Sequence, residues 1–172
     1  DLQEIHRPVH LAIIGGEPNV IPEDMSDEMA RLQKLCDELC MGGMVIFLGK
    51  RGQDTLPYYY SAAEVLVMPS LYESFGMVAI EAMACGLPVI ASRAGGLRFT
   101  IQDGQNGLLV PPGDSVALAA ALQQLLTDGD LRSRMGAQGR RMASNYRWKR
   151  VAEDMTGVYA ALEEERRQHG LR

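Results

Sequence analysis

The sequence predicts an α/β protein with a Rossmann-like parallel sheet and helices on both faces. Short apolar runs alternate with helical patterns in units of about 30 residues, which is typical of βαβ units. The apolar runs end at Gly, Pro or polar residues, as buried parallel strands do. At roughly 150 residues per domain, the 172 residues correspond to a single domain over 1–172.

The first part of the chain is expected to alternate strands with helices. Residues 25–39 carry Met, Leu and Cys at helical spacing, after two acidic residues that favour a helix N-terminus. The expected elements are strands at 9–14, 44–48 and 65–68, and helices at 25–39 and 56–63.

The second part continues the alternation and then becomes helical. Gly86 follows an apolar helical run and is suited to the position just after a helix end. The expected elements are a helix at 77–85, strands at 89–92 and 107–110, and three helical segments from Asp114 on, with breaks near 128–130 and near Asn145.

Composition excludes several classes of protein. With 17 Lys and Arg against 22 Asp and Glu, the net charge of −5 argues against a nucleic-acid surface. No run approaches the roughly 20 apolar residues of a membrane span, and residues 1–4 lack the order of a signal peptide. Three cysteines favour a reducing, cytoplasmic setting, and Cys36 with Cys40 lack the second pair of a zinc site.

Residues 69–86 contain the main candidate site, in a polar loop that opens an apolar helix. Amides at a helix start favour anions, and Gly76 lacks a side chain that would keep a phosphate away. Glu81 interrupts an apolar run, where a buried acid needs partners, and Glu73 lies one turn above it. Two structural alternatives remain open: Glu73 as an exposed or helix-capping acid, and Glu81 bonded to a backbone group.

This stretch resembles the signature of the retaining glycosyltransferases of family 4 (group 1), which have the GT-B fold. Residues 69–89 match its pattern Pro-Ser-x-x-Glu-x-Phe-Gly-x-x-x-x-Glu-Ala-Met-Ala-x-Gly-x-Pro-Val almost position by position. Residues 95–100 resemble the sucrose-phosphate-synthase-like branch. Further similar segments are 47–49, 56–59, 62–65, 94–96, 103–104, 107–110, 112–114 and the helix that begins at Trp148.

The resemblance implies that the chain is the C-terminal, donor-binding half of a two-domain enzyme. The enzyme would transfer a sugar, with retention, from a nucleotide-diphospho-sugar to an acceptor hydroxyl. Glu73 would contact the donor sugar and stabilise the positive charge that develops at its anomeric carbon, and Glu81 would bind the ribose. The remaining donor-binding residues would be Ser74, Phe75, Gly76, Met77 and Val78 at the helix start, Gly49, Lys50 and Arg51 against the base, and Gly16, with Glu17 beside it.

The same resemblance sets expectations about cofactors and partners. The family needs no metal. Asp128 and Asp130 spell an Asp-x-Asp motif, but they fall between two helical segments, far from any strand end, and are interpreted as a turn and helix N-cap. The acceptor domain and a basic pair for the donor phosphates are expected to precede residue 1. Arg98 and its neighbours stand where many members carry an acid. Alone, the chain is expected to be inactive, and the alternatives are a non-catalytic nucleotide-binding module and a self-associating domain with a vestigial site.

Overall fold

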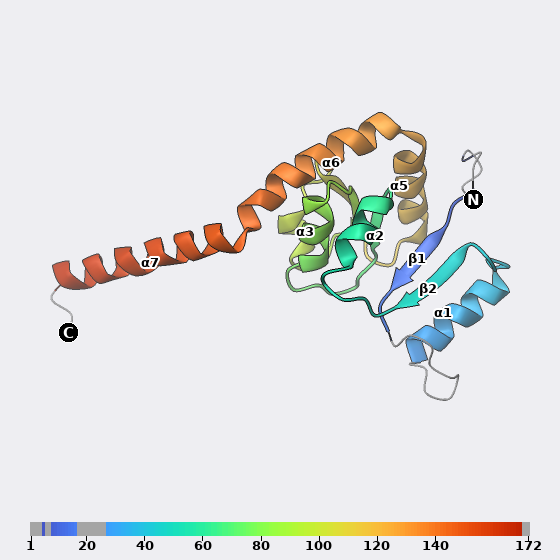
Figure 1. The fold of residues 1–172 in the computed structure, drawn as a ribbon, viewed down its shortest axis with the longest axis horizontal. Coiled ribbons are helices and arrows are strands. Elements are labelled where there is room, and N and C mark those ends of the chain that lie inside the picture. The colour runs from blue at the N-terminus through green and yellow to red at the C-terminus, as the bar shows by residue number, and fades with distance from the viewer. Residues whose placement is uncertain (1–4, 6–7, 17–26, 170–172) are drawn as a thin grey trace. The chain divides into compact units, whose positions relative to one another are not determined.

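The computed structural model describes residue 5, residues 8–16 and residues 27–169 (Figure 1). The chain forms two compact units, Leu2–Tyr59 and Tyr60–Arg172. The strands within each unit pair in parallel, as the sequence predicts. A single domain over 1–172 stays a prediction.

The unit Leu2–Tyr59 contains the parallel pair β1 (Leu11–Ile14) and β2 (Val45–Gly49), joined through α1 (Asp27–Glu38). Acidic Asp27 and Glu28 lie in the first turn of α1, where they favour the helix dipole. The structure extends β2 by one residue beyond the predicted strand, because Gly49 still pairs with Ile14 after a register shift. Of the predicted helix at 25–39, the first two residues lie outside the described ones.

The unit Tyr60–Arg172 is built on a three-stranded parallel sheet in the order β3-β4-β5. Helix α2 (Leu56–Ala62) crosses the boundary between the two units. The other elements are β3 (Leu66–Met68), α3 (Met77–Ala84), β4 (Val89–Ser92), α4 (Leu97–Thr100), β5 (Gly107–Val110), α5 (Ser115–Thr127), α6 (Gly129–Ala143), a 3-10 turn at Ser144–Tyr146 and α7 (Trp148–Gln168). All five predicted strands are therefore found, β4 and β5 with the predicted bounds.

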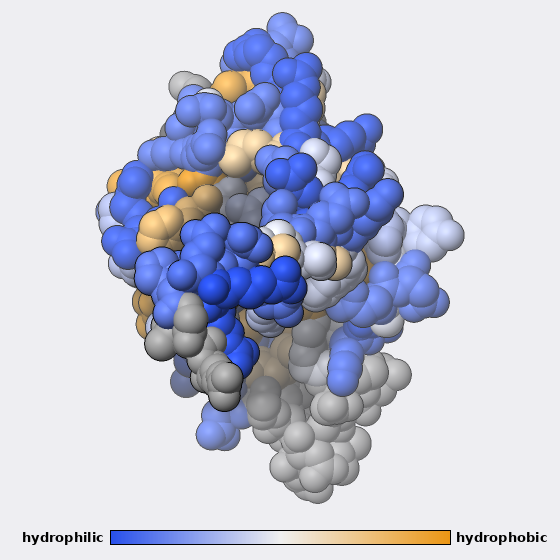
Figure 2. Space-filling view, turned by 90° about the vertical axis from the view of Figure 1, so that its left-hand side faces the viewer, coloured by the Kyte–Doolittle hydropathy of each residue, from blue (hydrophilic) through white to orange (hydrophobic). Residues whose placement is uncertain are grey.

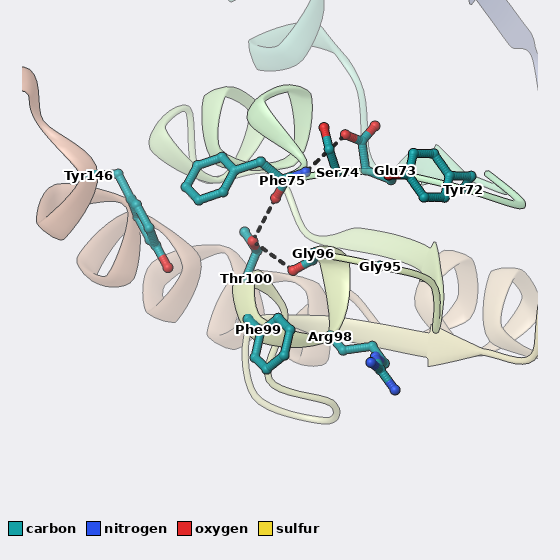
Figure 3. Close-up of a pocket in the computed structure, with 10 residues that line it drawn as sticks. All are labelled: Tyr72, Glu73, Ser74, Phe75, Gly95, Gly96, Arg98, Phe99, Thr100 and Tyr146. Atoms are coloured by element: carbon teal, nitrogen blue, oxygen red, sulfur yellow. Dashed lines mark hydrogen bonds between the residues drawn. The ribbon is translucent and has the colours of Figure 1, made fainter.

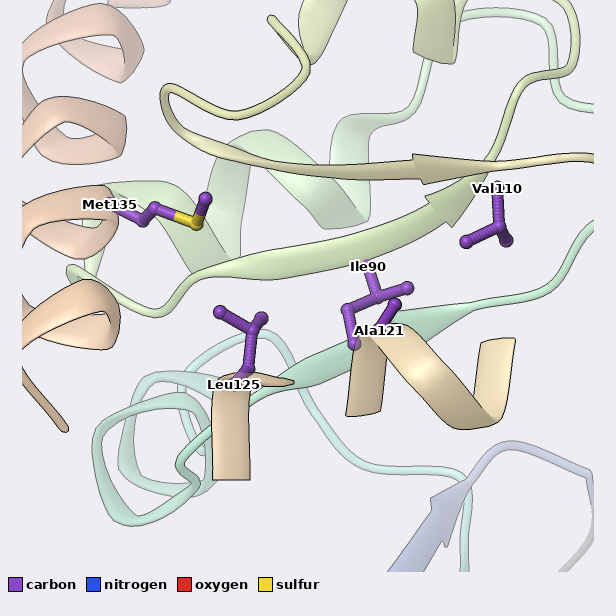
Figure 4. Packing of buried hydrophobic residues seen from close by; sticks show 5 residues of the cluster. All are labelled: Ile90, Val110, Ala121, Leu125 and Met135. Carbon is purple, nitrogen blue, oxygen red and sulfur yellow. The ribbon is translucent and has the colours of Figure 1, made fainter. Parts of the chain in front are cut away.

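The core of this unit lies on both faces of β4, all four residues of which are buried. Ile90 points toward Ala121 and Leu125 of α5, and Met135 and Val110 complete this cluster (Figure 4). Helix α3 packs against β3 and β4 and against α6. Full burial of a Leu or Ile side chain stabilises the fold by about 1.5–3 kcal/mol. The side chains buried on the two faces of β4 therefore stabilise the sheet in its position between the helices.

Several helix ends follow the predicted sequence signals. Gly86 has φ +81°, and the amides of Gly86 and Leu87 donate to the Met83 and Ala82 carbonyls in a Schellman motif. The Asp128 carboxylate accepts from the Leu131 amide at 2.8 Å and caps α6. The interpretation of 128–130 as a turn and N-cap is thus confirmed.

Helix α4 was not predicted from the sequence. It has only four residues, too few to show a helical period, and it follows Gly95 and Gly96. Its first and last residues, Leu97 and Thr100, are nevertheless buried. The structure therefore adds a short helix between the two predicted strands at 89–92 and 107–110.

Helix α7 follows α6 toward the C-terminus, and none of its residues is buried. Figure 2 shows the side from which α7 extends, where hydrophilic residues (blue) cover most of the face with hydrophobic ones (orange) between them. The helix exposes large apolar side chains at helical spacing, among them Trp148, Met155, Tyr159 and Leu162. Within residues 27–169, no helix combines the length and apolar composition that crossing a membrane requires.

Candidate functional site

The candidate site lies at the carboxyl end of the β3-β4-β5 sheet. The segment after β3 contains Glu73 and leads into α3, and the segment after β4 contains Gly95 and Gly96. The Gly96 amide donates to the Glu73 carbonyl at 2.9 Å, so the two segments are in direct contact. This is the edge at which parallel α/β sheets bind ligands.

Gly76 is the N-cap of α3 and has a left-handed conformation, with φ +86° and ψ +42°. A β-carbon there would lie 2.8 Å from Cδ2 of the buried Leu97. The sequence explains Gly76 by the space it leaves for a phosphate. The structure gives a different reason, because the missing side chain would point into the protein and the backbone conformation itself favours glycine.

The Glu73 carboxylate caps the start of α3. Its Oε1 accepts hydrogen bonds from the amides of Phe75, at 3.2 Å, and Gly76, at 3.1 Å. These contacts fit the helix-capping alternative for Glu73, since a carboxylate near a helix N-terminus interacts favourably with its dipole. The backbone amides of Phe75 and Gly76, two of the residues expected to bind the donor, therefore bind Glu73 in this structure.

The other two amides of the first turn, those of Met77 and Val78, have no partner among the described residues. Both residues are exposed. Free amides at a helix start carry partial positive charge. The first turn of α3 thus keeps two donors available to an anion, while Ser74 at its entrance is also exposed.

A hollow of about 380 Å³ adjoins the Glu73 loop (Figure 3). Four of its residues are aromatic, and Phe75 makes an edge-to-face contact with Tyr146 at 5.9 Å between ring centroids. The Arg98 guanidinium lies over the Phe99 ring at 5.8 Å. Its lining residues are Tyr72, Glu73, Ser74, Phe75, Gly95, Gly96, Arg98, Phe99, Thr100 and Tyr146.

Glu81 lies half-buried on α3, about one turn after the start of the helix at Met77. Its Oε2 accepts a hydrogen bond from the buried Tyr60 hydroxyl at 3.1 Å. Burial raises the pKa of Tyr60 above its ordinary value, and the negative charge and hydrogen bond of Glu81 raise it further. The partner of Glu81 is thus a side chain, not the backbone group of the structural alternative.

The predicted residues of the unit Leu2–Tyr59 lie at the carboxyl ends of β1 and β2. The Gly15 amide donates to the Gly49 carbonyl at 3.1 Å, which joins the two loops. Gly16 has φ +69° and Lys50 is exposed. Arg51 Nε donates to the Tyr59 hydroxyl at 3.0 Å. The neighbouring Glu17 lies outside the described residues.

No group of three metal-ligating side chains occurs within residues 8–16 and 27–169. Cys36, Cys40 and Cys85 are free thiols. Asp128 uses its side chain to cap a helix, as described above.

Sequence reasoning did not identify three residues that support the two glutamates. Tyr60 binds Glu81 directly. Thr100 is buried and donates to the Phe75 carbonyl of the Glu73 loop, and the buried Asn106 donates in turn to the Thr100 carbonyl. Residues 58–60 are three consecutive tyrosines, and nothing in the sequence indicates which of them is buried. The family resemblance includes Gly95 and Gly96 but assigns them no function.

Comparison with known proteins places the chain in a class. Residues 1–142 match the family described as glycosyl transferases group 1. The chain therefore belongs to the glycosyltransferase group 1 family. The predicted Rossmann-like fold of the C-terminal half of a GT-B glycosyltransferase is confirmed.

Particular relatives are similar over most of this chain but longer than it. A D-inositol 3-phosphate glycosyltransferase of Corynebacterium urealyticum is 40% identical over 156 residues, 90% of this chain and 36% of the relative. Sucrose-phosphate synthase of Thermosynechococcus elongatus is 42% identical with a TM-score of 0.80, over 91% of this chain and 39% of that one. Anabaena HepE in complex with UDP-glucose is 27% identical with a TM-score of 0.72, over 87% and 41%. The chain thus spans about two-fifths of these proteins.

Proposed function

We propose that this chain is the donor-binding half of a two-domain retaining glycosyltransferase. It binds a nucleotide-diphospho-sugar, and the sugar passes to a hydroxyl of an acceptor bound by the N-terminal domain. The most direct support is the arrangement around α3, where Glu73 stands at the helix start beside two free amides and Glu81 lies about one turn into the helix. The neighbour that contains UDP-glucose supports a donor of this class.

The start of α3 is the proposed position of the diphosphate. Departure of a nucleoside diphosphate places negative charge on oxygen, and prepositioned amide donors lower the barrier to this step. The amides of Met77 and Val78 are free to donate, and no metal or cofactor is needed for this contribution. Use of the Phe75 and Gly76 amides would require Glu73 to leave them first.

Glu73 and Glu81 have separate proposed roles. Glu73 binds the donor sugar's hydroxyls and stabilises the positive charge that develops at the anomeric carbon. Glu81 binds the ribose hydroxyls through Oε1, which has no partner among the described residues, while Tyr60 holds Oε2. Gly16, Gly49, Lys50 and Arg51 would border the base, and the enzyme would act in the cytoplasm.

Two measurements test this proposal. Calorimetry of the 172-residue chain with UDP, GDP and ADP is expected to show binding of at least one, and no heat with any of them would contradict it. In the two-domain enzyme, Glu73→Ala and Glu81→Ala should each remove most of the turnover. For Glu73 the expected loss is about 100-fold or more, as for other groups that stabilise charge in the transition state. Asp130→Ala, which changes an exposed acid on α6, is the matched control.

A non-catalytic nucleotide-binding module is the second candidate. It is favoured by the contacts of Glu73, which caps α3 as a purely structural acid would. This reading expects UDP binding by the chain, but unchanged affinity for a UDP-sugar when Glu73 is replaced. Wild-type turnover in both glutamate variants of the two-domain enzyme would favour it.

A further inference from the structure

The backbone around Glu73 is packed closely against the segment that follows β4. A β-carbon at Gly95 would collide with the Glu73 carbonyl oxygen, and one at Gly96 would collide with the Ser74 carbonyl oxygen. The Gly96 amide also donates to the Glu73 carbonyl at 2.9 Å. The position of the Glu73 loop is therefore set by the backbone that leads into α4.

Thr100 makes a second connection between α4 and this loop. Its side chain is only 2% exposed, and its hydroxyl lies 2.9 Å from the Phe75 carbonyl oxygen and 3.2 Å from that of Gly96. A hydroxyl has one proton to donate, and the shorter contact is to Phe75. The amide of Phe75 donates to the Glu73 carboxylate (Figure 3). The amide of Gly76, which shares a peptide unit with the Phe75 carbonyl, donates to the same oxygen.

Asn106 fixes Thr100 in turn. Its side chain is fully buried, its Nδ2 donates to the Thr100 carbonyl at 3.2 Å, and its Oδ1 accepts from the Gln102 amide at 2.8 Å. Nδ2 also lies 3.1 Å from the Met83 sulfur on α3. A buried polar side chain with its partners satisfied holds a local structure rigidly.

We propose that Thr100 is a positioning residue for Glu73: its buried hydroxyl, held in place through Asn106, fixes the Phe75 carbonyl and thereby the amides that orient the Glu73 carboxylate. The inference rests on the proposed function, because Glu73 matters to transfer only if it contacts the donor sugar. Thr100 itself reaches no ligand in this scheme. Its loss should weaken recognition of the sugar and leave recognition of the nucleotide alone.

A pair of variants isolates the hydroxyl. Thr100→Ser keeps it and Thr100→Ala removes it, so the two differ by one oxygen atom. Thr100→Val, which keeps the shape of the side chain, is available if the alanine variant does not fold. Thr127→Val on α5 is the matched control, since it also deletes a threonine hydroxyl bonded to a backbone carbonyl.

The first measurement is hydrogen exchange in the 172-residue chain without ligand. Relative to Thr100→Ser, Thr100→Ala should speed exchange of the Phe75 and Gly76 amides by about three- to tenfold, the effect of one net hydrogen bond. The Thr127→Val control should leave both amides unchanged. Equal exchange in the Ser and Ala variants would overturn the inference whatever the protein binds.

The second measurement compares Kd values for UDP-glucose and UDP by calorimetry. Thr100→Ala should weaken UDP-glucose binding by about three- to tenfold relative to UDP, and Thr100→Ser should restore the wild-type ratio. An equal loss for both ligands would mean a merely structural role and would overturn the inference. Glu73→Gln separates the two proposals: if it changes the ratio and Thr100→Ala does not, only the inference fails. If Glu73→Gln leaves the ratio unchanged, the proposed role of Glu73 fails.

Discussion

The hydroxyl of Tyr60 lies 3.1 Å from Oε2 of Glu81, so a buried tyrosine holds one oxygen of the half-buried acid on α3. A carboxylate in this position loses hydration, and a hydrogen-bond donor compensates part of that cost. The contact also fixes the direction of the second oxygen, Oε1. It thus converts a flexible acid into a prepositioned acceptor.

Tyr60→Phe is expected to weaken nucleotide binding. Removing one hydrogen bond to Glu81 should raise the Kd for UDP by about three- to tenfold. Calorimetry with UDP and 2′-deoxy-UDP measures the effect, and the penalty for removing the 2′-hydroxyl should be smaller in the variant than in the wild type. Tyr58→Phe alters an exposed tyrosine and serves as the control. A Kd unchanged in Tyr60→Phe would show that Glu81 does not need its partner.

Stability should fall at alkaline pH because of Tyr60. Burial, followed by the charge and hydrogen bond of Glu81, raises the pKa of Tyr60 above the ordinary 10.0. The folded protein then keeps a proton that the unfolded chain loses, so this stabilisation is present below about pH 10 and decreases as the pH rises further. Urea unfolding between about pH 8 and about pH 11 should therefore show a steeper loss for the wild type than for Tyr60→Phe. If the free energy of unfolding fell equally with pH in the wild type and in Tyr60→Phe, the raised pKa of Tyr60 would be contradicted.

Gly95→Ala should destabilise the protein more than Gly104→Ala does. Both glycines have positive φ, +46° and +76°, so each substitution costs about 1–2 kcal/mol in backbone strain. Only at Gly95 would the new β-carbon collide with the Glu73 carbonyl, and overpacking adds about 1–3 kcal/mol. Gly104 has open space around it. Urea unfolding measures both variants, and equal losses would show that the loop moves aside freely.

Asn106→Ala should be among the most destabilising single changes at this edge. It removes the partners of the Gln102 amide and the Thr100 carbonyl inside the protein, at a cost of about 2–4 kcal/mol in the free energy of unfolding. Gln105→Ala is the neighbouring control, because that side chain is exposed. Its effect should be about 0.5 kcal/mol or less. If Asn106→Ala lowered the free energy of unfolding by only about 0.5 kcal/mol, water would be replacing the hydrogen bonds of Asn106.

The fold could be predicted because its strands are short apolar runs with clear stops. Strands β4 and β5 have the predicted bounds. The error at the end of β2 arises from Gly49, which reads as a turn residue but pairs with Ile14 after a register shift. Helix α4 was not predicted, because four residues are too few to show the helical spacing of apolar side chains.

The sequence by itself determined the family, the succession of strands and helices along the chain and the placement of Glu73 and Glu81 on one helix and its preceding loop, because these depend on local pattern and spacing. The tertiary structure decided what surrounds the two acids. Tyr60 reaches Glu81 across 21 positions, and Thr100 reaches Phe75 across 25. Which buried side chain satisfies which polar group depends on the packing of segments distant in sequence, and no local pattern records that choice.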